Sequence, residues 1–267
     1  MPLNGVARLG NEVRPLPAKD GPGMPHDFWT YLLVGFAAQI VDGSIGMAYG
    51  VVSTSVLLAA GVAPAQASAA VHIAKIFAGT ASGLSHLWLG NVDWPLCRRL
   101  LIPGCIGGLV GAALVSYAPV DLIKPLVAAY LLLMGIVLLA RAARFRAMPA
   151  PSAAVTPLGL VGGLLDSLGG GWGPVVTSTL IARGHAPRQV IGSVNLAEVF
   201  VAVAQSAMFA ALLGFGYFDI VIGLALGGIV AAPFAALLAR YAPARLLIVL
   251  VGVAVSAVSL RTLFGIL

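Results

Sequence analysis

Two ionisable residues lie at equivalent places in apolar stretches of the sequence. Lys75 follows Pro64 by 11 positions, and Glu198 follows Pro187 by the same 11 positions. At 1.5 Å per residue, each charge lies about 16 Å along its helix, too deep for the head group to reach a polar surface easily. Charges at such depth in a membrane helix mark substrate or ion pathways. We therefore expect both residues to be functional, and the alternative is a buried ion pair that only clamps two helices together.

Polar residues recur around these charges at steps of three and four. The first stretch carries Ser68, His72, Lys75, Gly79, Ser82 and His86, and the second carries Asn195, Glu198, Ala202 and Gln205. Residues with this spacing share one helix face, and a polar face on a membrane helix points to the bundle interior or a water-filled cavity. We expect His72 and Asn195 to contact substrate, and His72 and Glu198 to carry protons. The alternative is that these polar residues only form hydrogen bonds between helices.

Two short Gly-rich segments, 42–50 and 166–174, interrupt the apolar sequence 124 positions apart. A helix that restarts within the membrane directs unsatisfied N–H groups and the positive end of its dipole inward, which favours an anion. A duplicated broken element of this kind indicates a transporter binding site. The predicted substrate-binding residues at the breaks are Gly43, Ser44, Gly46, Ser53, Thr54, Gly169, Gly170, Gly171, Trp172, Thr177 and Ser178. The alternatives are close helix packing for the glycines and bonds to the helix's own carbonyls for the hydroxyls.

The composition indicates an all-α, polytopic membrane protein. The chain is 60% hydrophobic and 9% charged, against about 25% charged residues in soluble domains. The net charge of +6 comes from arginines in short loops, so we interpret it as a topology signal and predict no nucleic-acid partner. The His and Cys residues do not show metal-ligand or redox spacing, so the sequence predicts no metal site and no cofactor.

The apolar segments divide the chain into a polar tail at 1–27 and two membrane repeats at 28–147 and 148–267. The tail is expected to be disordered or to lie on the surface, and Met24 is an alternative start. Each repeat is predicted to hold a broken or re-entrant helix hairpin and three transmembrane helices. The predicted segments of the first repeat are 29–41, 46–60, 65–88, 100–117 and 122–140. Those of the second are 157–167, 174–183, 188–213, 220–239 and 244–264.

The arginines predict that the two repeats have opposite orientations. They occupy alternate loops in the two halves: Arg98, Arg99, Arg141, Arg144 and Arg146 in the first, and Arg183, Arg188, Arg240 and Arg245 in the second. Because cytoplasmic loops are enriched in Arg and Lys, the repeats must cross the membrane in opposite senses. We predict a multi-pass inner-membrane protein with both termini outside. Inverted repeats permit alternating access around a midplane site.

These features resemble the TauE/SafE sulfite exporter family over about 28–267. The resemblance lies in the duplicated break, in Gly61-Val62-Ala63-Pro64 and Gly184-His185-Ala186-Pro187, and in Gly-Asn-Val-Asp-Trp at 90–94. It implies a permease for sulfite, thiosulfate or an organosulfonate such as sulfoacetate, coupled to protons. The first break, Asp42-Gly43-Ser44-Ile45-Gly46, departs from the family's Gly-Gly-Gly pattern, which leaves the preferred anion open.

The sequence thus predicts a secondary active transporter, not an enzyme. Its partners would be a small sulfur oxyanion, protons and the lipid bilayer, and a homodimer is left open. A passive anion channel is the first alternative, and a membrane-embedded enzyme or assembly factor the second, although no nucleophile–base pair, metal set or redox pair supports it. We further expect Lys75 and Glu198 to meet across a pseudo-two-fold axis, so that an incoming anion competes with Glu198 for Lys75 while Glu198 takes up a proton.

Overall fold

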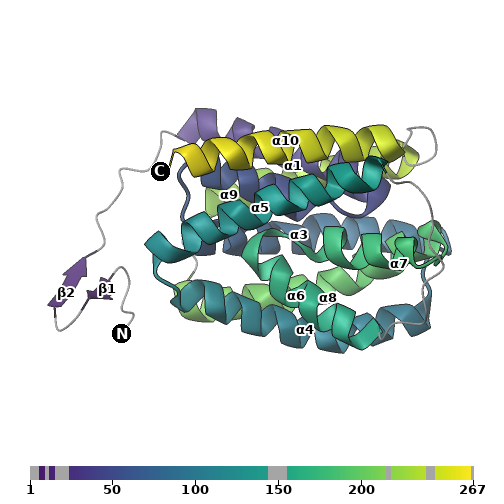
Figure 1. The fold of residues 1–267 in the computed structure, drawn as a ribbon, viewed down its shortest axis with the longest axis horizontal. Coiled ribbons are helices and arrows are strands. Elements are labelled where there is room, and N and C mark those ends of the chain that lie inside the picture. Colours follow the sequence, from purple (N-terminus) through teal and green to yellow (C-terminus); the bar gives the residue numbers. More distant parts are fainter. Residues whose placement is uncertain are drawn as a thin grey trace.

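The computed structural model describes residues 6–9, 12–15, 24–143, 155–214, 218–238 and 244–265. Within these ranges the protein is a bundle of helices (Figure 1), with one short antiparallel hairpin of β1 (Val6–Leu9) and β2 (Glu12–Pro15) near the N-terminus. The all-α membrane architecture expected from the sequence is therefore present. Arg144, Arg146 and Arg240, which contributed to the topology prediction, lie outside the described residues.

The helices follow the chain in two matching series. The first series is α1 (Met24–Ile45), α2 (Tyr49–Ala59), α3 (Pro64–Trp88), α4 (Trp94–Tyr117) and α5 (Val120–Ala143). The second series is α6 (Val155–Gly169), the π-helical turn η1 (Gly173–Thr177), α7 (Ser178–Ala182), α8 (Pro187–Leu213), α9 (Phe218–Leu238) and α10 (Ala244–Phe264). Most of these bounds lie within a few residues of the predicted ones.

The first helix differs from its prediction. α1 begins at Met24, inside the predicted tail, and continues through Asp42 and Ser44 to Ile45. Its apolar part, Phe28–Ile45, has 18 residues and is long enough to cross a membrane. The predicted segment 29–41 is therefore too short for this helix, whereas α6 has only 15 residues.

The start of α4 also differs. The sequence placed Arg98 and Arg99 in a polar loop, but the helix already begins at Trp94. The cause is the Asp93 carboxylate, which accepts a hydrogen bond from the N–H of Leu96 at 3.1 Å. An aspartate at this position satisfies an otherwise unpaired N–H group and starts a helix. Both arginines therefore lie in the first turns of α4.

Helix length and composition agree with a multi-pass membrane protein. Among the described residues, five helical stretches are long and apolar enough to span a bilayer: Phe28–Ile45, Trp94–Tyr117, Val120–Ala143, Pro187–Leu213 and Arg245–Phe264. α3 has 25 residues but is less apolar, because one of its faces carries a stripe of polar residues. Ser68, His72, Lys75, Ser82 and His86 are all buried, which confirms that they share the inward face of α3.

Helices of the two series pack in exchanged pairs. α1 packs against α9 and α6 packs against α4, while α3 packs against α8 and α5 against α10. Since α6, α8, α9 and α10 correspond to α1, α3, α4 and α5, each contact of one series has its counterpart in the other. The glycines with positive φ pair in the same way: Gly46 with Gly170, Gly61 with Gly184, and Gly90 with Gly214. This is the pattern that a two-fold relation between the repeats produces.

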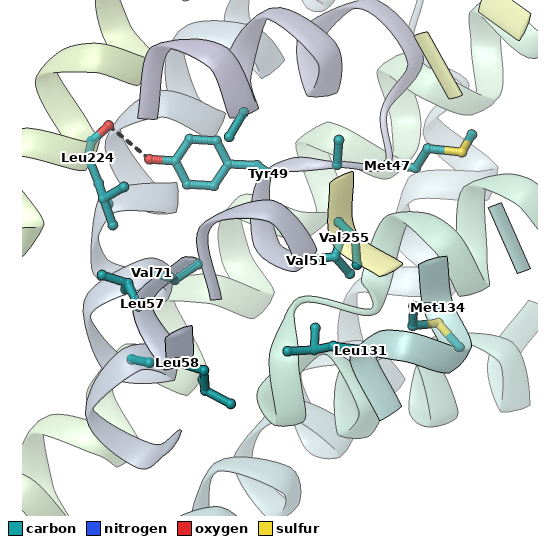
Figure 2. Packing of buried hydrophobic residues seen from close by; sticks show 14 of the residues in the cluster. Met47, Tyr49, Val51, Leu57, Leu58, Val71, Leu131, Met134, Leu224 and Val255 are labelled. Carbon is teal, nitrogen blue, oxygen red and sulfur yellow. Dashed lines mark hydrogen bonds between the residues drawn. The ribbon is translucent and has the colours of Figure 1, made fainter. Parts of the chain in front are cut away.

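The short helix α2 is held inside the protein by an apolar core (Figure 2). Leu57 and Leu58 of α2 pack with residues that include Val71 of α3 and Leu131 of α5. The Tyr49 hydroxyl donates a hydrogen bond to the carbonyl of Leu224 in α9 at 2.9 Å. Non-helical backbone within a membrane is tolerated only where protein or a water-filled cavity covers it. Residues 42–50 and 169–174 are all buried, so both breaks meet this condition.

Candidate functional site

The first break is closed by an aspartate. One carboxylate oxygen of Asp42 accepts hydrogen bonds from the N–H groups of Ala48 at 2.8 Å and Tyr49 at 3.1 Å. Gly46 turns the chain with φ of 69°, a conformation that glycine adopts without a steric penalty. Asp42 therefore satisfies the start of α2 from within the chain.

The second break has the same geometry. One carboxylate oxygen of Asp166 accepts from the N–H of Trp172 at 3.0 Å, and Gly170 turns the chain with φ of 83°. Asp166, Gly170 and Trp172 each lie 124 positions after their counterparts Asp42, Gly46 and Ala48. The N–H groups at Ala48, Tyr49 and Trp172 are thus bonded to carboxylates. This corrects the expectation that the restarted helices leave these groups unsatisfied for an anion.

The two breaks pack directly against each other, backbone to backbone. A Cβ atom on Gly50 would lie 2.3 Å from the Cα of Gly170, and one on Gly173 would lie 2.3 Å from the Cα of Met47. The Thr177 hydroxyl donates to the carbonyl of Gly46 at 2.9 Å. Close packing, the alternative that the sequence left open for these glycines, is therefore one of their roles.

A cluster of buried charges lies at the contact of α3, α6 and α8. The Lys75 ammonium is 2.5 Å from a carboxylate oxygen of Glu198 and 3.1 Å from one of Asp166. The side chains of Lys75, Asp166 and Glu198 are 5%, 0% and 10% exposed. The expected meeting of Lys75 and Glu198 is confirmed. Burying these charges is tolerable only because they pair, and removing one partner would leave an uncompensated charge.

His72 of α3 contacts the same cluster and its own helix through its two ring nitrogens. Its Nδ1 lies 2.7 Å from the carbonyl oxygen of Ser68, and its Nε2 lies 3.1 Å from a carboxylate oxygen of Asp166. The Ser68 hydroxyl lies 3.2 Å from the same Nδ1 and donates to the carbonyl of Ser167 at 2.7 Å. His72 thus links Ser68 of its own helix to Asp166 of the second break.

Comparison with known proteins places these features in a family. The sequence pattern of the sulfite exporter TauE/SafE family matches residues 31–262. The chain belongs to the TauE/SafE family. It is 43% identical over 248 residues to "Probable membrane transporter protein YtnM" of Bacillus subtilis (strain 168), and the match covers 88% of this chain and 82% of YtnM. No solved structure matches the chain. Family and relative both indicate a membrane transporter rather than an enzyme.

Several of the expected substrate-binding residues of this TauE/SafE protein surround the breaks. Asn195 donates from its amide to the Ser82 hydroxyl at 3.2 Å, while its amide oxygen faces Gly46. The hydroxyls of Ser53 and Thr54 in α2 are buried and have no hydrogen-bond partner within the described chain. These unpaired groups are available to a polar ligand, because a buried polar atom normally finds a partner.

Other expected residues have local structural roles instead. The Ser44 hydroxyl bonds to the carbonyls of Ile40 and Ala235, and that of Ser178 bonds to the carbonyl of Pro174. Each thus bonds a carbonyl four residues earlier, as the sequence left open. A Cβ on Gly43 would meet the side chain of Ala235 in α9 at 2.6 Å, and one on Gly169 would meet Leu131 in α5 at 2.9 Å. These four residues contribute to helix packing around the breaks.

Sequence reasoning missed three residues of the site. Asp42 and Asp166 were noted only as the ends of the breaks, yet each holds a break together. A charged residue repeated at the same position of a duplicated membrane element is the signal that could have found them. Tyr130 gave no such signal; its buried hydroxyl has no partner within the described chain, and a Cβ on Gly171 would lie only 1.7 Å from it. It contacts the second break from α5.

Proposed function

We propose that this TauE/SafE protein is a secondary active transporter of a small sulfur-containing oxyanion, such as sulfite, thiosulfate or a sulfoacetate-like organosulfonate. The observation that carries the proposal is the buried Lys75 ammonium, shared between Glu198 and Asp166 where α3 meets α8. A cation in low dielectric is the strongest attractor for an anion that the described part of the membrane bundle contains. The partners that now hold it are carboxylates, whose oxygens a sulfur oxyanion can replace.

Anion binding proceeds by exchange at Lys75. Glu198 contacts only one cationic group among the described residues, so an oxyanion that takes its place leaves the Glu198 carboxylate without a counter-charge. An unpaired buried carboxylate is costly and takes up a proton to become neutral. One anion and one proton are then bound together. His72, whose Nε2 lies 3.1 Å from a carboxylate oxygen of Asp166, is the second proton-carrying group.

Movement across the membrane follows from the relation of the two repeats. We propose that they are inverted, with α3 and α8 crossing next to the axis and exposing the cluster alternately to either side. The exchanged helix pairs support a two-fold relation. The start of α1 and the end of α10 lie at the same end of the bundle (Figure 1), as inverted repeats with both termini outside require. The inner membrane and a cytoplasmic Arg-rich end complete this topology.

The Arg-rich end is supported by contacts between the repeats. Arg188, at the start of α8, donates a hydrogen bond from Nε to the amide oxygen of Asn91 in the α3–α4 loop. The N–H of Asp93 in the same loop donates to the Ser193 hydroxyl at 2.7 Å. The beginnings of α4 and α8 therefore lie at the same end of the bundle. Cysteine labelling from either side of the membrane, in a background lacking Cys97 and Cys105, should place positions 98 and 188 on the same, cytoplasmic face.

Transport is tested with the purified protein in proteoliposomes. Labelled sulfite and sulfoacetate should each be assayed for counterflow against the unlabelled anion, first without and then with an imposed pH difference. A coupled transporter shows counterflow, and accumulates the anion when a pH difference is applied. Flux that only dissipates an imposed anion gradient, at a rate independent of the pH difference, would identify a passive channel instead.

A further inference from the structure

The two breaks carry different partners at equivalent positions. Asp166 in the second break contacts the His72 Nε2 and the Lys75 ammonium, both at 3.1 Å. The positions that follow His72 and Lys75 by 123 residues are Asn195 and Glu198, and the counterpart of Asp166 is Asp42. By the two-fold relation of α3 and α8, Asn195 and Glu198 are therefore the equivalent residues for Asp42. Where the second break has an imidazole and an ammonium, the first has an amide and another carboxylate.

Asn195 presents an oxygen to the first break that lacks a donor. Its amide nitrogen donates to the Ser82 hydroxyl, and its amide oxygen lies on the side of the first break. That oxygen lies 3.3 Å from the position that a Cβ on Gly46 would occupy. The residue is only 2% exposed, and the oxygen has no hydrogen-bond partner within the described chain. An acceptor buried without a donor is destabilising, so this oxygen is available to a positive ligand.

The first break contains a carboxylate without a cationic partner among the described residues. Of the carboxylates of Asp42, Asp166 and Glu198, the last two contact the Lys75 ammonium. The Asp42 carboxylate accepts two backbone N–H bonds, but no Lys, Arg or His of the described residues lies within ion-pair distance of it. The C-terminal end of α1, at Ile45, adds the negative end of a helix dipole at the same place.

We propose that Asp42, Asn195 and Glu198 form a binding site for a small monovalent cation, Na⁺, at the first break. Oxygen atoms alone suit a hard cation, and a cation would give the Asp42 carboxylate the counter-charge that the described residues do not supply. Within the described chain there is no group of three His, Cys, Asp or Glu side chains suited to a transition metal, so an alkali cation fits this ligand set better. Interrupted transporter helices coordinate Na⁺ with the carbonyls at their C-terminal half-helix ends.

The cation site would couple directly to the anion site. Glu198 now contacts Lys75 at 2.5 Å, and a cation beside Asp42 attracts the same carboxylate away from the ammonium. Lys75 is then free for an oxyanion, so cation and anion each raise the affinity for the other, as reciprocal coupling demands. This part of the inference rests on the proposed anion transport. The Na⁺ site itself does not, because its oxygen ligands belong to the protein alone.

The site is tested by thermal unfolding of the purified full-length protein in detergent. Sodium gluconate is titrated against choline gluconate at constant ionic strength and constant pH, without a sulfur oxyanion. The expected result is a rise in Tm that saturates with Na⁺ and that choline does not produce. Asp42→Asn keeps an oxygen for the Ala48 and Tyr49 N–H groups but removes the charge. It should abolish the Na⁺-dependent rise and have a higher Tm than the wild type in choline alone.

Two further variants make the test decisive. Asn195→Ala removes the unpaired oxygen and should raise the Na⁺ concentration at the midpoint of the Tm rise at least tenfold. This variant also keeps the test possible if Asp42→Asn does not fold. Asp121→Asn, the same change at an exposed position of α5, should leave the response unchanged. A wild-type Tm that is indifferent to Na⁺, or a rise that persists in Asp42→Asn, overturns the proposal. A Tm that depends on pH and not on Na⁺ would also overturn it, and would assign the site to a proton.

Failure of this site and failure of the proposed function are distinguishable. Sulfite is added to the wild-type protein in choline and in sodium buffer. If sulfite raises Tm equally in both, the anion site stands and the Na⁺ site is refuted. If sulfite, thiosulfate and sulfoacetate have no effect in either buffer while Na⁺ does, the cation site stands and the proposed anion is wrong.

Discussion

Replacing Lys75 with Met removes the cation that two buried carboxylates share. Glu198 at 2.5 Å and Asp166 at 3.1 Å would both lose this partner, although Asp166 keeps its contact with His72. Breaking a buried ion pair from one side costs about 3–5 kcal/mol, because the remaining charge is left uncompensated. For a chain of this size, each kcal/mol corresponds to roughly 2–4 °C in Tm. We therefore expect Lys75→Met to lower Tm by about 6–20 °C.

The partner variant supplies the test of the pair itself. Glu198→Gln leaves Lys75 paired with Asp166, so it should cost less, about 1–3 kcal/mol. The double variant removes both charges of the 2.5 Å contact and should be more stable than the sum of the two single costs predicts, by at least about 1 kcal/mol. Thermal unfolding of the four purified proteins in detergent, with Lys124→Met as a control at a partly exposed position, measures these differences. Additive costs, or a Lys75→Met Tm equal to that of Lys124→Met, would refute the buried pair.

Two more substitutions test the contacts of the breaks. Gly50→Ala should destabilise the protein by about 1–3 kcal/mol or more, because the added Cβ would lie 2.3 Å from the Cα of Gly170. The control Gly79→Ala, whose Cβ meets a side-chain methyl of Val199 at 3.4 Å, should be neutral or stabilising. Equal Tm values for the two variants would show that the breaks are not in contact. Tyr130→Phe removes a buried hydroxyl without a partner among the described residues and should leave Tm unchanged or raise it, while a clear fall in Tm would mean that the hydroxyl is bonded.

The long helices and the central ion pair could be predicted from local sequence. α3 and α8 begin with a proline at the first helical position, which fixes the backbone for a helix start. The equal distance of Lys75 and Glu198 from these prolines placed both charges at the same level of equivalent helices. Their meeting then required only that the two helices pack against each other, which duplication suggested and the fold confirms.

The closure of the breaks could not be predicted in the same way. Asp166 is 91 positions from Lys75, and no local pattern encodes which segment a buried carboxylate will face. The sequence also treated Asp42, Gly43 and Ser44 as part of a break, because glycine and polar residues weaken a helix in isolation. In the folded protein Ser44 bonds to the carbonyls of Ile40 and Ala235. Close packing on α9 stabilises the helical conformation of these residues, so α1 continues through them. Tertiary contacts decided both points.

Proton-driven uptake by two variants tests the central claim most directly. Proteoliposomes containing wild-type protein, Lys75→Ala or Glu198→Gln would be assayed for exchange of labelled sulfite, and separately for its accumulation under an imposed pH difference. The account predicts that Lys75→Ala abolishes both activities. Glu198→Gln should retain exchange but lose pH-driven accumulation, because the amide vacates Lys75 without taking up a proton. Undiminished pH-driven accumulation in Glu198→Gln would contradict the account and leave the Lys75–Glu198 pair as a structural clamp.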